Sequence, residues 1–173
     1  MKQRIAITGP ESTGKSWLAE KLATHFGTVW VPEYARQYLH DLQRPYTMAD
    51  VERIAEEQFR LNSDAARVSR LSFADTEMLV CSIWCEVVFG QVPGRLKQLL
   101  KEQEFDYYLL CDVDLEWTPD PLREHPDRRQ EIFGRYLEQL DKLKLPYGIV
   151  RGAGGERLSN ALTLLNDHFT TRI

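Results

Sequence analysis

Short, mostly apolar runs alternate along this chain with longer segments in which apolar residues recur at helical spacing. Runs of the first kind predict buried strands, and spacing of three and four residues predicts amphipathic helices. The expected strands are Arg4–Thr8, Thr28–Val31, Leu71–Ala74, Tyr107–Cys111 and Tyr147–Val150. The expected helices are Trp17–Phe26, Thr47–Arg70, Met78–Phe89, a short one opened by Pro93 and Gly94, Asp127–Leu143 and Glu156–Phe169.

Alternation of strands with helical segments is the signature of a sheet whose parallel strands are joined by helical crossovers. We therefore expect an α/β fold, a three-layer α/β/α sandwich with a five-stranded parallel sheet. No repeat, low-complexity tract or linker interrupts the pattern, so residues 1–173 are expected to form a single domain.

Composition narrows the classes of partner. The chain is 43% hydrophobic and 28% charged, as in a folded globular protein, and its net charge of −4 argues against a nucleic-acid partner. The sequence contains no signal peptide and no apolar run of membrane-spanning length, so no membrane association is expected. Three cysteines, an odd number, argue against a disulfide framework and favour a reducing, cytoplasmic location.

Residues 9–16 read Gly-Pro-Glu-Ser-Thr-Gly-Lys-Ser, directly after the first strand and before the first helix. This is the full P-loop pattern, in which glycines let backbone N–H groups turn inward around phosphates. Lys15 is expected to reach the β- and γ-phosphates of ATP or GTP, and the Ser16 hydroxyl to coordinate Mg²⁺. The expected nucleotide-binding residues are Gly9, Glu11, Ser12, Thr13, Gly14, Lys15, Ser16 and Trp17.

Two carboxylates follow neighbouring strands and should face the P-loop, because ligands bind at the carboxyl ends of parallel strands. Asp75 closes the third strand and is a candidate Mg²⁺ ligand together with Ser16; the alternative is a helix N-cap for Met78–Phe89. Glu33 follows the second strand and could accept or orient the proton of an attacking hydroxyl; the alternative is a surface glutamate. Arg36 lies one helical turn further on, where it could pair with Glu33 or touch substrate.

The stretch 112–129 contains three prolines and dense charge, unlike packed structure. Cations are disfavoured in the first turn of a helix, yet Arg128 and Arg129 stand at the start of the predicted Asp127–Leu143 helix. This mild frustration suggests that the arginines serve a ligand, because phosphoryl transfer needs cations on the moving group. We expect a lid over about 112–129 in which Arg123 and Arg128 act in catalysis; the alternative is a solvated charged loop.

Four segments together resemble the ribosylnicotinamide kinase domain of NadR-type proteins, a P-loop NTPase family with a kinase-like, AAA ATPase-like fold. They are the P-loop, Glu33-Tyr34-x-Arg36, Asp75-Thr76 with its aromatic-rich helix, and Trp117-x-x-Asp120-x-x-Arg123. The resemblance spans nearly the whole chain and implies that residues 9–16 bind ATP, that Asp75 joins Ser16 around Mg²⁺ and that Arg123 belongs to the lid. It also implies that Glu33, Tyr34, Arg36, Asp75 and Thr76 meet the substrate.

The segment Val31-Pro32-Glu33 is also similar to the second-strand glutamate of deoxynucleoside kinases, which acts there as the base. Two departures from the NadR pattern stand out. NadR proteins carry an adenylyltransferase domain ahead of the kinase, and here the first strand is expected directly after Met1, leaving no room for one. Pro121 stands where a glycine is expected after Asp120, and its fixed φ is expected to change the geometry of the lid.

The leading hypothesis is an ATP-dependent kinase that transfers the γ-phosphoryl to a nucleoside hydroxyl, with nicotinamide riboside as the expected small-molecule substrate and the mononucleotide as product. A pyridinium cation favours an aromatic wall, for which Tyr34, Tyr38, Trp84 and Trp117 are candidates. The alternatives are a kinase of another small acceptor, a regulatory ATPase or nucleotide switch, and a binding module without catalysis. The chain lacks an Asn-Lys-x-Asp segment, and Asp75-Thr-Glu-Met is not the Asp-x-x-Gly of a GTPase switch.

Overall fold

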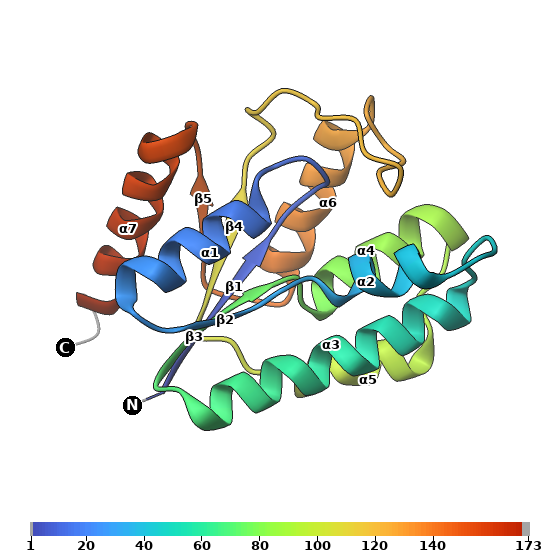
Figure 1. The fold of residues 1–173 in the computed structure, drawn as a ribbon, viewed down its shortest axis with the longest axis horizontal. Coiled ribbons are helices and arrows are strands. Elements are labelled where there is room, and N and C mark those ends of the chain that lie inside the picture. Colours follow the sequence, from blue (N-terminus) through green and yellow to red (C-terminus); the bar gives the residue numbers. More distant parts are fainter. Residues whose placement is uncertain (1, 171–173) are drawn as a thin grey trace.

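A computed structural model describes residues 2–170 of the chain. Its centre is a parallel sheet of five strands, β1 (Gln3–Thr8), β2 (Val29–Val31), β3 (Leu71–Asp75), β4 (Tyr107–Cys111) and β5 (Tyr147–Val150) (Figure 1). The strand order is β2-β3-β1-β4-β5, and every pair of neighbours is parallel. The order reverses direction at β1, so the loop after β1 lies where ligands bind in open α/β sheets.

Helices cover both faces of this sheet. They are α1 (Lys15–Phe26), α2 (Tyr34–Asp41), α3 (Met48–Val68), α4 (Met78–Phe89), α5 (Gly94–Glu102), α6 (Arg129–Lys142) and α7 (Gly154–Thr170). Figure 1 shows α1 and α7 together on one side of the sheet, with α3, α4 and α6 on the other. The expected three-layer α/β/α sandwich with a five-stranded parallel sheet is confirmed.

The two faces of the sheet separate residues that alternate along each strand. Ile5, Ile7 and Leu109 pack with α1 and α7, whereas Ala6 and Leu110 pack with α4 and α6. Both sets are fully buried, as expected of a parallel sheet that is covered on both sides. The chain therefore has a rigid centre from which the loops after the strands project.

Several element bounds differ by a few residues from the sequence-based expectation, and four differences concern the elements around the loops after the strands. Helix α2 was not expected, and β3 extends through Asp75. Helix α6 begins at Arg129 and not at Asp127. Asp75 is not the N-cap of α4: that position is taken by Glu77, whose carboxylate accepts a hydrogen bond from the Leu79 amide.

Within residues 2–170, no helix combines the length and the apolar character needed to cross a bilayer.

Candidate active site

The P-loop joins the end of β1 to the start of α1 through backbone conformations that need glycine. Gly9 has φ of 131°, and a Cβ there would lie 2.8 Å from the Cys111 carbonyl oxygen on β4. Gly14 has φ of 75° and is the N-cap of α1. Both are values that residues with a side chain rarely adopt. The close approach of the loop to β4 and its positive φ angles place the first amides of α1 at the carboxyl edge of the sheet.

Side chains within the loop hold its shape. The Thr13 hydroxyl and the Lys15 ammonium both donate to the Pro10 carbonyl, each at 2.8 Å. Thr13 is buried, whereas Lys15 is partly exposed and lies at the N-terminus of α1. Lys15 is thus placed beside the amides that the motif predicts to bind phosphate, and its ammonium adds positive charge at the positive end of the helix.

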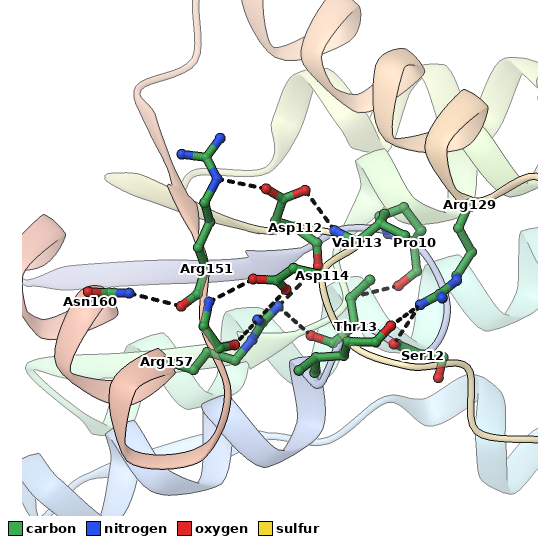
Figure 2. A network of polar contacts seen from close by, with 12 residues as sticks. Pro10, Ser12, Thr13, Asp112, Val113, Asp114, Arg129, Arg151, Arg157 and Asn160 are labelled. Atoms are coloured by element: carbon green, nitrogen blue, oxygen red, sulfur yellow. Dashed lines mark hydrogen bonds and ion pairs between the residues drawn. The ribbon is translucent and has the colours of Figure 1, made fainter.

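A buried arginine that the motifs do not predict fixes the outer side of the P-loop. Arg157 on α7 is 1% exposed, and its guanidinium donates to Thr13 O (2.8 Å), Asp112 O (3.2 Å), Gly152 O (2.6 Å) and Asp114 Oδ1 (2.8 Å). Figure 2 shows these groups converging from the P-loop, from the stretch after β4 and from the loop after β5. A planar guanidinium with donors in a fixed fork suits such a junction.

A cavity of about 970 Å³ lies against the P-loop, a size typical of sites that hold small molecules. Residues 9–17 form one wall, α2 contributes Ala35, Arg36 and Leu39, and α4 contributes an apolar wall that includes Trp84. Residues 120–125 cover it, and Glu33 lines it between the P-loop and α2. The cavity therefore brings together a phosphate-binding loop, a carboxylate and an apolar compartment.

The tryptophan and tyrosine side chains that line the cavity are Trp17, next to the P-loop, and Tyr46, Trp84 and Tyr136. The rings of Tyr46 and Trp84 meet edge to face with centroids 5.1 Å apart, and the Trp84 indole N–H donates to the Tyr46 hydroxyl at 3.1 Å. Of the four aromatic residues suggested by the sequence, Trp84 lines the cavity; Tyr34, Tyr38 and Trp117 are not among its lining residues. Tyr46 and Tyr136 lay outside any motif, and their role follows from the tertiary packing.

Asp75 is buried beneath the P-loop, and within the described residues neither of its carboxylate oxygens has a hydrogen-bond partner. Burial and the nearby Glu33 carboxylate raise the pKa of Asp75 to about 6, while the Lys15 ammonium and the Ser16 hydroxyl oppose this rise. An unpartnered buried carboxylate is costly unless a cation or a donor meets it. Its oxygens beside Ser16 fit the donor set that Mg²⁺ takes in proteins.

Glu33 and Thr76 lie close to each other at the ends of β2 and β3. The Thr76 hydroxyl donates to the Glu33 carboxylate across 3.4 Å, and Thr76 is buried with φ of 82°. Glu33 is the N-cap of α2, yet its side chain makes no capping hydrogen bond within the described residues. Its carboxylate can therefore act toward the cavity that it lines.

The proline-rich segment 112–129 lies over the P-loop and contacts it at several points. The amides of Glu124 and His125 donate to the Glu11 carboxylate at 3.0 and 3.1 Å. The Thr118 amide donates to the Ser12 hydroxyl at 2.9 Å. Arg129 donates to the carbonyls of Ser12 (3.2 Å) and Leu115 (2.9 Å), as Figure 2 shows for Ser12.

The same segment is attached to the far wall of the cavity. Arg36 on α2 pairs with Asp120 at 2.8 Å, and the Tyr46 hydroxyl donates to the Glu124 carboxylate. This contact raises the pKa of the Tyr46 hydroxyl, after the larger effect of its burial. The segment thus spans the cavity from the P-loop to the aromatic compartment.

The arginines of this segment have different surroundings. Arg123 lines the cavity and lies 6.0 Å from the centroid of the Trp117 ring, which Arg129 also approaches, at 5.6 Å. Arg128 is not among the lining residues: both of its guanidinium contacts, at 2.8 Å, go to Glu131 on the surface of α6. The frustration seen in the sequence is therefore relieved locally at Arg128. The cations of this segment that contact the P-loop are Arg129, through the Ser12 carbonyl (3.2 Å), and Arg123, through the Ser12 hydroxyl (3.4 Å).

Most of the residues expected at the site line one cavity, but four do not. Those that line it are Gly9, Glu11, Ser12, Thr13, Gly14, Lys15, Ser16, Trp17, Glu33, Arg36 and Arg123. Asp75 and Thr76 lie buried behind the wall, Tyr34 packs near Tyr38, and Arg128 is directed to Glu131.

A family model described as "AAA domain" matches residues 4–157, most of the chain. The chain belongs to this AAA domain family. Curated relatives include the protein named trifunctional NAD biosynthesis/regulator protein NadR from Escherichia coli (28% identical over 152 residues) and from Salmonella typhimurium (31% over 124 residues). These alignments cover 83% and 69% of the chain but 37% and 30% of the relatives, so the chain spans about a third of their length.

Solved structures with the same fold include NadR in complex with NAD and AMP-PNP (TM-score 0.77, 22% identity) and NadR in complex with NR (TM-score 0.80, 21% identity). Each similarity covers 96% of this chain and about half of the other, 49% and 51%. A deoxyadenosine kinase from M. mycoides has a TM-score of 0.69 at 16% identity, with 95% of this chain and 100% of the kinase covered. The resemblance to NadR and the P-loop kinase-like fold are thereby confirmed.

Proposed function

We propose that the chain is an ATP-dependent kinase that phosphorylates a hydroxyl of a nucleoside, with nicotinamide riboside as the leading acceptor. The observation that carries the proposal is the single cavity in which the P-loop, Glu33 and an aromatic compartment meet under an arginine-bearing segment. This combination suits phosphoryl transfer, because most of the catalysis of that reaction consists of positioning the reactants and stabilising charge.

The phosphates of ATP would lie against the P-loop amides and Lys15 at the N-terminus of α1. Ser16 and Asp75 would hold Mg²⁺, directly or through water, and the ion would neutralise part of the phosphate charge. The unpartnered oxygens of Asp75 support this assignment. The NadR complex with AMP-PNP, an analogue of ATP, supports ATP as the donor.

In the proposed reaction the acceptor hydroxyl oxygen forms a bond to the γ-phosphorus while the bond from that phosphorus to the β–γ bridging oxygen breaks. The electron pair remains on ADP, and the hydroxyl proton goes to the Glu33 carboxylate. We assign the base to Glu33 and not to Asp75, because Glu33 lines the cavity and Asp75 is buried behind the P-loop. Arg123 would stabilise the charge on the moving group, and segment 112–129 would exclude water.

Two observations support nicotinamide riboside as the acceptor. Tyr46 and Trp84 form a wall on which a pyridinium cation can lie, and NadR has been solved in complex with NR. Another nucleoside is the second candidate acceptor, because the structural similarity to a deoxyadenosine kinase extends over the whole of that kinase. The three cysteines are buried and free, which supports a reducing, cytoplasmic location as part of the proposal.

The test is an ATP-consumption assay of the purified protein against nicotinamide riboside, common nucleosides and a control without acceptor. We expect ADP to form with nicotinamide riboside and the mononucleotide to accumulate in equal amount. Consumption with another nucleoside alone would reassign the acceptor. Hydrolysis that is indifferent to every acceptor would overturn the kinase proposal in favour of a regulatory ATPase.

A further inference from the structure

The start of α2 is capped by a residue from another helix. The first N–H groups of a helix have no partner within it, and the N-cap side chain normally supplies one. Glu33 holds the N-cap position of α2 but provides no such bond within the described residues. The Tyr34 amide donates instead to Gln58 Oε1 on α3, at 2.8 Å.

The nitrogen of the Gln58 side-chain amide hydrogen-bonds to the residue before Glu33. Gln58 Nε2 donates to the Pro32 carbonyl at 3.3 Å and to Asn62 Oδ1 at 3.1 Å. These partners fix the orientation of the Gln58 amide: its oxygen must face the Tyr34 N–H group, which is a donor, and its nitrogen must face the Pro32 carbonyl, which is an acceptor. Gln58 is fully buried, so water does not compete for these bonds. One side chain therefore fixes the backbone on both sides of Glu33.

Asn62 extends this contact to the next strand. Its Nδ2 donates to the Thr76 carbonyl at 3.2 Å, and Thr76 directly follows Asp75. The ends of β2 and β3, which carry the two carboxylates of the site, are thus connected through α3. The buried Gln58 and the partly exposed Asn62 therefore form a polar link between these two strand ends that does not pass through the P-loop.

We propose that Gln58 is a positioning residue that caps α2 in place of Glu33 and so leaves the Glu33 carboxylate free to act in the cavity. The inference rests on the proposed role of Glu33 in phosphoryl transfer. It differs from a stabilising role, because it requires that loss of the Gln58 amide moves Glu33 relative to the acceptor. A displacement of about 1 Å at a reacting group is enough to lower a rate by a factor on the order of 100.

The test compares wild type with Gln58→Met, which keeps the length of the side chain and removes both polar atoms. Ala66→Gly is the matched control, because it weakens the same helix, α3, at a buried position near its C-terminal end. We expect Gln58→Met to lower kcat for the acceptor by about 10- to 100-fold while KM for ATP stays within about twofold. Ala66→Gly should lower the melting temperature and leave kcat unchanged.

A second readout does not depend on the acceptor. The exchange of the Tyr34 amide with deuterium should be slow in wild type and in Ala66→Gly and fast in Gln58→Met. An unchanged exchange rate would overturn the cap, and a kcat equal to that of wild type would overturn the positioning role. If wild type phosphorylates no acceptor, the proposed function fails, and the comparison is made on ATP hydrolysis: equal rates in wild type and Gln58→Met would then overturn the inference.

Discussion

Arg157 offers the sharpest quantitative test of how the P-loop is held. Arg157→Met keeps much of the bulk of the side chain but removes four hydrogen bonds, to Thr13, Asp112, Gly152 and Asp114. Removing one member of a buried ion pair costs about 3–5 kcal/mol. Asp114 is 30% exposed and can be solvated after the change, so we expect the lower end, about 3 kcal/mol. For a chain of this size that corresponds to a melting temperature lower by about 6–12 °C.

The substitution should also weaken ATP binding, because the peptide group between residues 13 and 14 is planar. Arg157 holds the Thr13 carbonyl toward α7, and this directs the Gly14 N–H to the opposite side, toward the phosphate site. Loss of the arginine lets this peptide group rotate. Titration calorimetry with Mg²⁺ and ATP measures the effect on affinity, and thermal unfolding measures the effect on stability.

Arg151→Met is the matched control. Arg151 pairs with Asp112 at 2.8 Å but is 64% exposed, so the pair contributes at most about 1 kcal/mol. Its melting temperature should therefore fall by less than about 4 °C, with unchanged ATP affinity. If Arg157→Met melts within 2 °C of wild type, or if both variants lose the same amount, the buried guanidinium does not hold the P-loop as argued.

Five further substitutions test separate parts of the site. Lys15→Ala should lower turnover by at least about 100-fold without unfolding the chain, and full turnover would refute the phosphate assignment. Glu33→Gln should lower kcat by about 10²- to 10⁴-fold at unchanged ATP affinity, and a near-normal kcat would require another base. Asp75→Asn should abolish Mg²⁺-dependent turnover. In the absence of metal, the same substitution should raise the free energy of unfolding at pH 7.5 by up to about 3 kcal/mol. The reason is that the pKa of the Asp75 carboxyl is raised from 3.8 to about 6, and such a carboxyl destabilises the fold as the pH rises through that interval. Urea unfolding should show this gain disappearing below about pH 4, and a gain independent of pH would contradict the burial argument. Arg123→Ala should lower kcat, whereas Arg128→Ala should leave it unchanged because Arg128 is paired with Glu131 on the surface; equal effects in kcat assays would contradict the assignment of the lid cation.

The sheet and the P-loop could be predicted because their signals are local. The run from β1 through residues 9–16 into α1 is continuous in the sequence, so the motif carries its own structural context. Helix α2 gave no such signal: of its residues 34–41 only Ala35 is buried, and Pro32 precedes it. Its place depends on packing against α3 and on the Gln58 cap, which the local pattern does not encode.

The other features that the sequence did not predict depend on polar contacts between residues far apart in the chain. Arg157 lies in the predicted closing helix, where a charged residue is expected to be exposed. Its burial depends on four partners, of which Asp114, Asp112 and Thr13 lie 43 to 144 positions away. The pairing of Arg128 with Glu131 could have been foreseen from the i,i+3 spacing, which places the two side chains on one helical face. The catalytic role of segment 112–129 stays a prediction, and it is the fold that decides which of its arginines, Arg123 and Arg129, contact the P-loop.

The central claim is that this cavity transfers a phosphoryl group to an acceptor and not to water. The most direct measurement follows the label of ATP carrying ³²P at the γ-position, with Mg²⁺ and nicotinamide riboside, and separates labelled mononucleotide from labelled inorganic phosphate. We expect most of the label in the mononucleotide for wild type and none there for Lys15→Ala. Label that appears solely as inorganic phosphate, or equal transfer by Lys15→Ala, would contradict the account.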